Sequence, residues 1–199
     1  MNSPLQIGVT GGIGSGKSIV CKIFNALNVP IYDADSRAKW VMEHNTNVKT
    51  ALLTEFGNQV FFEDGRLNRI FIASSVFNQS EKLGRLNQIV HPQVALDYSL
   101  WVQENKHSPY VIKEAALLFE SGSYQMLDKI IMVSCPEELR VERIRKRDPH
   151  RSSEEILAII SKQLPEQEKI NRADYCLLND ESQSLIQQVL HLHHTFLGG

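Results

Sequence analysis

A glycine-rich segment near the start of the chain has the residue types and spacing of a phosphate-binding loop. Gly11-Gly12-Ile13-Gly14-Ser15-Gly16-Lys17-Ser18 follows the pattern G-x-x-x-x-G-K-[ST]. Its glycines let backbone N–H groups approach phosphate oxygens closely, and the N-terminus of a following helix adds partial positive charge. Lys17 would reach the β- and γ-phosphates, and the Ser18 hydroxyl would bind Mg²⁺. The segment therefore predicts a site for a nucleoside triphosphate.

Two carboxylates follow the next predicted strand, which ends in Asp33-Ala34-Asp35. With the usual doubly wound strand order, Asp33 would lie beside the loop, where it could accept a proton from a substrate hydroxyl or hold Mg²⁺ through water. Asp33 could instead be a turn or N-cap residue, although Asp35 is the better N-cap candidate for a helix over 36–43. The chain lacks the guanine-reading Asn-Lys-x-Asp of GTPases, and no predicted strand ends in the Asp-Asp or Asp-Glu of motor ATPases.

Basic side chains are concentrated at residues 140–151. Six basic and two acidic residues give this stretch a charge of +4, against −6 for the rest of the chain. Arg140, Arg143 and Arg147 recur at helical spacing, so they share one helix face. They could clasp nucleotide phosphates or could form a solvated basic face. Arg151 begins a lid-like insertion, where arginines would supply charge and exclude water during transfer.

The elements that must position these residues alternate between short apolar strands and helical segments. A helix over 18–28 follows the glycine-rich loop, and the pattern indicates a parallel sheet with helices on both faces, an α/β fold. The predicted strands cover residues 5–10, 30–33, 110–113, 129–134 and 175–178.

Two insertions interrupt this alternation. Residues 34–108 are too long for a simple crossover connection, and they predict an inserted helical subdomain that could grip substrate. Pro92 suits the first turn of its last helix. The predicted helices of this insertion cover residues 36–43, 48–56, 67–77 and, approximately, 83–103.

The second insertion, residues 148–172, is interpreted as a lid. Ser152 and Glu155 have the spacing of a capping box, which predicts a helix that runs through Gln163. Pro165 would then end that helix.

Composition limits the class of protein. The 199 residues are 42% hydrophobic, and 21 basic against 23 acidic side chains give a net charge of −2. This predicts one globular domain, or one core with insertions, and argues against a broad nucleic-acid binder. Cys21, Cys135 and Cys176 are expected to be reduced and mostly buried. The start, Met1 to Pro4, does not read as a signal peptide, and no apolar run approaches a membrane span. We therefore expect a cytoplasmic protein with no membrane association.

Taken together, these motifs resemble the dephospho-coenzyme A kinase family of P-loop kinases through nearly the whole chain. The Asp-Ala-Asp, Gly-Arg-Leu-Asn-Arg and His-Pro segments make this resemblance more specific than the loop alone. The matching segments are Ile7 to Ser18, Asp33-Ala34-Asp35, Phe56-Gly57, Asp64-Gly65-Arg66-Leu67-Asn68-Arg69, Leu86-Asn87-Gln88-Ile89-Val90-His91-Pro92, Leu117-Leu118-Phe119-Glu120, Arg143 with Arg147, Gln163 with Lys169, and Ala173-Asp174 with Asn179.

The resemblance implies a P-loop nucleoside triphosphate hydrolase-like three-layer sandwich with a five-stranded parallel sheet. It also implies transfer of the ATP γ-phosphoryl group to the ribose 3′-hydroxyl of dephospho-CoA, with Asp33 as base and Lys17 and Arg143 as further catalytic residues. Ser18 would hold Mg²⁺. The implied ATP-binding residues are Gly12, Ile13, Gly14, Ser15, Gly16, Lys17, Ser18, Ile19, Arg143 and Arg147. The implied substrate-binding residues are Asp33, Arg66, Arg69, His91 and Glu120, although His91 could simply stabilise a helix start.

The sequence departs from the family pattern at positions that concern the lid. Arg140 stands where Gln is common, and Ile159 stands where a lid arginine often precedes the Gln now at 163. Arg140 or Arg151 could replace the missing charge. Two alternatives remain open: a P-loop kinase for another small hydroxyl or nucleoside monophosphate, and a non-catalytic nucleotide or CoA sensor. No nucleic-acid partner and no obligate protein partner are implied.

Overall fold

The structure is a computed structural model that describes residues 3–77 and 79–198. The chain divides into two compact units. The first consists of Met1–Asp33 and Asn105–Gly199, and the second of Ala34–Glu104. Met1 and Asn2, on which the expectation about a signal peptide partly depends, lie outside the described residues. No helix of the described residues is both long enough and apolar enough to span a membrane.

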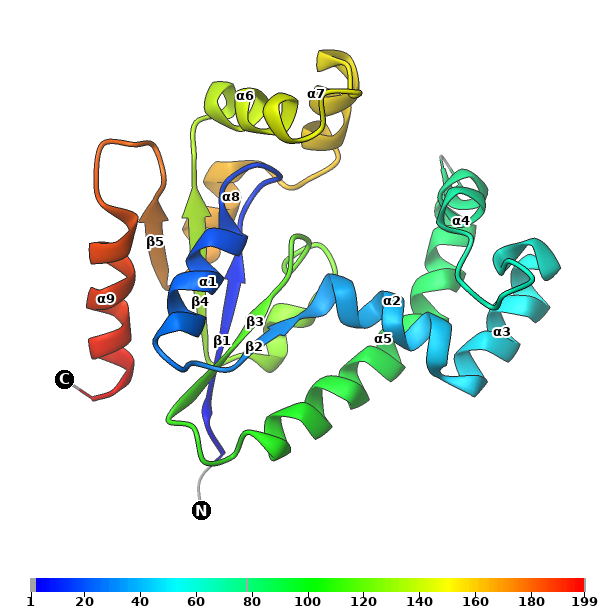
Figure 1. Ribbon diagram of the computed structural model, residues 1–199, viewed down its shortest axis with the longest axis horizontal. Helices are drawn as coiled ribbons and strands as arrows, with labels where there is room; N and C mark the ends of the chain where they lie inside the picture. Colours follow the sequence, from blue (N-terminus) through cyan, green and yellow to red (C-terminus); the bar gives the residue numbers. More distant parts are fainter. Residues whose placement is uncertain (1–2, 78, 199) are drawn as a thin grey trace. The chain divides into compact units, whose positions relative to one another are not determined.

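The first unit is built on a five-stranded parallel sheet of order β2-β3-β1-β4-β5 (Figure 1). The predicted α/β fold is thereby confirmed, and the strand predictions differ from the structure by at most one residue at an end. The apolar runs are buried on both faces, as is usual for parallel strands. The strands are β1 (Leu5–Thr10), β2 (Ile31–Asp33), β3 (Tyr110–Glu114), β4 (Lys129–Ser134) and β5 (Tyr175–Leu178).

Helices cover both faces of this sheet. The core between the sheet and two of the helices contains Ile7, Phe24, Ile112 and Val189, all fully buried. These two helices are α1 (Lys17–Ala26) and α9 (Leu185–Phe196). Behind the sheet in Figure 1, α8 packs against β4. The remaining helices of this unit are α6 (Glu137–Arg147), α7 (Ser153–Ser161), α8 (Glu166–Arg172) and the short 3-10 helix η2 (Ser123–Met126).

The second unit is helical and has a hydrophobic core of its own. Fully or almost fully buried residues of this core include Val48, Leu52 and Val60. Asn45 and Asn68 cap two helices by accepting hydrogen bonds from backbone N–H groups. The elements are α2 (Ala34–His44), α3 (Thr46–Phe56), η1 (Asn58–Val60), α4 (Arg69–Val76) and α5 (Ser80–Glu104). That this unit binds substrate stays a prediction.

Two sequence predictions in this unit are wrong. Pro92 lies inside α5, not in the first turn of a helix, and His91 therefore does not stabilise a helix start. Buried Val90 and Tyr98 on either side show why: tertiary packing holds the helix through a residue that breaks isolated helices. Asp35 is not an N-cap, because α2 begins at Ala34, directly after β2, and Asp35 lies in its first turn.

Helix ends in the predicted lid also differ from expectation. The Ser152–Glu155 capping box is present, but α7 ends at Ser161, two residues before Gln163. Pro165 does not end that helix and is instead the N-cap residue of α8, a place where its fixed φ is tolerated. Residues 162–165 thus form a short connection between two helices.

The three cysteines are free thiols. Cys21 and Cys135 are buried as expected, whereas Cys176 is exposed. Burial raises the pKa of Cys21 well above its ordinary range, and the neighbouring charge of Glu114 adds to this effect. Burial also raises the pKa of Cys135, and buried cysteines in such surroundings are usually structural.

Candidate active site

The glycine-rich loop joins β1 to α1 in a conformation that depends on two glycines. Gly14 and Gly16 have φ angles of 80° and 95°, in the left-handed region that favours glycine. A Cβ on Gly16 would also lie 2.2 Å from Nδ2 of Asn179. The N–H groups of Gly14 and Gly16 have no acceptor among the residues that the structure describes. Open N–H groups at the N-terminus of α1 form an anion-binding site.

Lys17 and Ser18 begin α1, and both side chains have partners at the loop. Nζ of Lys17 donates to the backbone oxygens of Gly11, at 3.0 Å, and Gly12, at 3.3 Å, so the ammonium group lies over the loop. The Ser18 hydroxyl donates to Oε1 of Glu114 at 3.0 Å. Glu114 is the last residue of β3. The loop thus presents a cation and a hydroxyl–carboxylate pair at the carboxyl end of the sheet, where open α/β sheets bind ligands.

Asp33 lies at the same sheet edge as Glu114. The two residues are register partners at the ends of β2 and β3, and Asp33 is exposed. The sequence prediction assumed the usual doubly wound order, but β3 stands between β1 and β2, so Glu114 is the carboxylate on the strand next to the loop. Sequence reasoning missed Glu114. A polar residue that ends a buried strand was the only signal for it.

The three arginines of α6 that share a helix face have different surroundings in the structure. Arg140 is buried against the loop, where a Cβ on Gly12 would lie 2.0 Å from its Nη1. Arg143 donates to Sγ of Cys135 and to the backbone oxygen of Asn179, each at 3.1 Å. Arg147 is exposed and pairs with its neighbour Asp148 at 2.9 Å. The three residues therefore do not form one solvated basic face.

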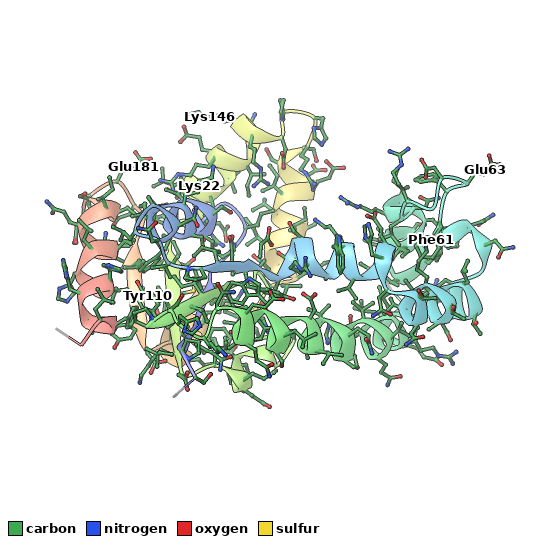
Figure 2. The ribbon with its side chains drawn as sticks, turned by 60° about the horizontal axis from the view of Figure 1, so that its bottom comes forward. Lys22, Phe61, Glu63, Tyr110, Lys146 and Glu181 are labelled. Carbon is green, nitrogen blue, oxygen red and sulfur yellow. The ribbon has the colours of Figure 1, made fainter. Side chains whose placement is uncertain are left out.

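Asn179 connects Arg143 to the loop, because it contacts both. Its Nδ2 donates to the backbone oxygen of Ser15 at 2.8 Å. Arg143 also pairs with Oε1 of Glu181 at 3.0 Å, and Figure 2 labels Glu181 in the segment between β5 and α9. Arg143 therefore belongs to the support of the phosphate-binding loop. Its part in binding nucleotide stays a prediction.

Comparison with known proteins identifies this arrangement. The family model described as dephospho-CoA kinase matches residues 5–184. The chain belongs to the dephospho-CoA kinase family. A curated Dephospho-CoA kinase from Bacteroides fragilis is 37% identical over 188 residues, which are 94% of this chain and 91% of that protein.

Solved structures agree with the family assignment. A Thermus thermophilus protein is 34% identical, with a TM-score of 0.88 and full coverage of both chains. A structure of Dephospho-CoA kinase from Campylobacter jejuni is 26% identical, with a TM-score of 0.69 and 95% of each chain covered. The chain is therefore a P-loop kinase, and members of this family use ATP as a substrate.

The resemblance to dephospho-CoA kinases also predicted Glu120 as a substrate-binding residue. In the structure Glu120 contacts α8 and the residues that precede this helix. It pairs with Nζ of Lys169 at 2.8 Å and accepts a hydrogen bond from the N–H of Leu164 at 2.9 Å. Burial alone would raise the pKa of Glu120, but these two partners outweigh burial and hold it below its ordinary range. The role of Glu120 in binding substrate stays a prediction.

The other substrate-binding candidates of the dephospho-CoA kinase resemblance lie in the second unit. Arg66 is exposed in the turn between Phe61 and Leu67 and pairs with Asp64 at 2.6 Å. Figure 2 shows this turn, with Phe61 among the helices and Glu63 at its outer tip. The exposed Arg69 begins α4, and the exposed His91 lies within α5. The roles of Arg66, Arg69 and His91 stay predictions.

Proposed function

We propose that the chain transfers the γ-phosphoryl group of ATP to the ribose 3′-hydroxyl of dephospho-CoA, which gives CoA and ADP in the final step of CoA biosynthesis. One observation carries the proposal. In a chain that belongs to the dephospho-CoA kinase family, Lys17, the Ser18–Glu114 pair and Asp33 gather at the carboxyl edge of one sheet. A loop for phosphate, a cation and a candidate base are the parts that phosphoryl transfer requires.

Each group has a defined task in the proposed reaction. The carboxylate of Asp33 accepts the proton of the 3′-hydroxyl as its oxygen forms a bond to the γ-phosphorus. The bond from that phosphorus to the β–γ bridging oxygen breaks, and ADP leaves. Lys17 stabilises the negative charge on the transferred group, and the open loop N–H groups bind the phosphate chain. The exposed position of Asp33 leaves it accessible to an acceptor hydroxyl.

Mg²⁺ fits the donor set at the loop. The Ser18 hydroxyl and the Glu114 carboxylate are hard oxygen ligands, and their atoms lie 3.0 Å apart. Among the described residues, no group of three His, Cys, Asp or Glu side chains could hold a metal unaided. Mg²⁺ commonly takes one or two protein ligands and completes its shell with phosphates and water. When bound, it would neutralise charge on the phosphate oxygens.

The remaining site residues would act on the two substrates. Arg66, Arg69 and His91 would bind the phosphates or the pantetheine arm of dephospho-CoA. Arg143 and Arg147 would act on the nucleotide side, and residues 148–172 would exclude water as a lid. We place the enzyme in the cytoplasm because its three cysteines are free thiols, as cytoplasmic proteins keep them.

An acceptor assay tests the proposed function. The full chain is incubated with ATP, Mg²⁺ and dephospho-CoA, and CoA is separated by chromatography, with Lys17→Ala as the control. We expect CoA and ADP in equal amounts from the wild-type protein. A nucleoside monophosphate that turns over faster than dephospho-CoA would replace this acceptor in the proposal. Tight nucleotide binding without any transfer would make the chain a sensor instead.

A further inference from the structure

The first half of the phosphate-binding loop is held by a side chain from a distant part of the sequence. The N–H of Ile13 donates to Oε1 of Gln163 at 2.9 Å. Gln163 lies in the connection between α7 and α8, which also carries Leu164. A neutral carboxamide oxygen thus fixes the orientation of one loop N–H group.

A buried arginine supports the residue before Ile13. The side chain of Arg140 is 7% exposed, and its Nη1 occupies the space that a Cβ on Gly12 would need. Its ion-pair partners are Glu166 at 3.5 Å and Glu137 at 3.7 Å, and its Nε has no hydrogen-bond partner within the described chain. A guanidinium group this deeply buried is costly unless carboxylates compensate it. The two carboxylates, and above all the less exposed Glu166, compensate the charge of Arg140 beside the loop.

Glu166 ties the same connection to the sheet. Its Oε1 accepts hydrogen bonds from the hydroxyl of Ser134, at 2.5 Å, and from the N–H of Cys135, at 3.2 Å. Its Oε2 faces Arg140. Residues 163–166, which we name the strap, therefore contact the loop through Gln163, the end of β4 through Glu166, and α6 through the ion pair with Arg140.

We propose that Gln163 and Arg140 are positioning residues that preorganise Gly12 to Gly14 for the triphosphate, and that the strap is a fixed part of the site. A glycine-rich loop has many accessible conformations, and ordering it on binding costs free energy. The hydrogen bond to Ile13 and the contact on Gly12 reduce that cost beforehand. Any lid movement would then be confined to residues 148–162. The inference deepens the proposed function, and it rests on the binding of nucleotide by this loop, whatever the acceptor is.

Amide hydrogen exchange and ADP affinity test the proposal without phosphoryl transfer. Gln163→Met keeps the side-chain length and removes the amide oxygen, whereas Gln163→Glu keeps an oxygen acceptor. Gln167→Met is the matched control, because Gln167 is exposed on α8 and its side chain, within the described part of the chain, bonds only to Asn171. We expect Gln163→Met to speed exchange at Ile13 and to weaken ADP binding by about 3- to 10-fold each, the worth of one hydrogen bond.

The other variants distinguish a role in positioning the loop from a general effect on folding. Gln163→Glu should keep the exchange protection of Ile13, and Gln167→Met should match the wild type in both measurements. Arg140→Met, which removes the charge and every hydrogen-bond donor, should also weaken ADP binding. Unchanged exchange and unchanged ADP affinity in Gln163→Met would overturn the proposal. So would tighter ADP binding, because Gln163 would then be a placeholder that phosphate displaces. A wild-type protein that binds ADP but forms no CoA would contradict the proposed function alone.

Discussion

The hydroxyl of Ser18 donates a hydrogen bond of 3.0 Å to Oε1 of Glu114, which joins the first turn of α1 to the end of β3. This contact brings a carboxylate to a phosphate-binding loop whose own residues supply none. The thiol of Cys21 lies close enough to Glu114 that the carboxylate helps to raise its pKa, after the larger effect of burial. Glu114 thus lies between the loop hydroxyl and a buried thiol of α1, next to the position where the phosphates and Mg²⁺ would bind.

Glu114→Gln should raise the Mg²⁺ concentration that half-maximal activity requires by at least about 10-fold, because losing even an outer-shell partner costs about that much and Glu114 is proposed as a direct ligand. The amide still accepts the Ser18 hydrogen bond, so the fold and the loop should be retained. Initial rates of CoA formation over a Mg²⁺ titration measure the effect. An unchanged Mg²⁺ dependence would remove Glu114 from the metal site.

Lys17→Met should lower the rate of CoA formation by at least about 10²-fold, because the ammonium group is the loop's only side-chain cation to oppose charge on the transferred phosphoryl group. Loss of the two contacts to Gly11 and Gly12 should change thermal stability little, since these are partly exposed hydrogen bonds. A thermal unfolding curve separates the two effects. A variant that keeps wild-type turnover would contradict the assignment.

Asp33→Asn should lower turnover by roughly 10²-fold or more, the scale of losing a general base. ATP affinity should stay nearly unchanged, because Asp33 ends β2, two strands away from β1 and the loop. Turnover with dephospho-CoA and ATP binding by calorimetry give the two quantities. Wild-type turnover in this variant would give Asp33 a structural role at the junction of β2 and α2.

Local sequence signals were sufficient to predict the limits of the strands and the position of the phosphate-binding loop. Runs such as residues 129–134 are apolar, bounded by polar residues and buried on both faces, so their limits follow from composition. The capping box at Ser152 is likewise a local pattern, and it forms as predicted. Pro92 marks the limit of such rules, because the packing of Val90 and Tyr98 keeps one helix where a local rule predicts a helix start.

The support of the site depends on contacts that no local pattern contains. Glu114 is one of 23 acidic residues, and only the strand order shows that it is the one beside Ser18. Gln163 and Ile13 are 150 positions apart, and the helical spacing that puts Arg140 and Arg147 on one helix face does not show that Arg140 is the buried one. Which of them is buried depends on how α6 packs against the loop.

The ion pair between Glu120 and Lys169 gives the stability of the first unit a defined pH dependence. Lys169 is 1% exposed, and the partners of Glu120 hold its pKa below the ordinary value of 4.5. A carboxyl group whose pKa is lower in the folded state stabilises that state above its unfolded pKa. The contribution is therefore complete at neutral pH and is lost as the pH falls below 4.5, through the folded pKa.

Glu120→Gln should consequently reduce the free energy of unfolding by about 3–5 kcal/mol at pH 7, because it leaves the buried Lys169 without its counter-charge. The difference between wild type and variant should shrink as the pH falls below 4.5, since protonation of Glu120 makes the wild type resemble the variant. Urea unfolding from pH 7 to pH 3 measures it. Glu168→Gln is the matched control, because Glu168 pairs with Arg172 at the surface of α8, the helix that also carries Lys169. A difference for Glu120→Gln that stays constant over this range would show that the effect comes from hydrogen-bond geometry alone, without the charge of Glu120.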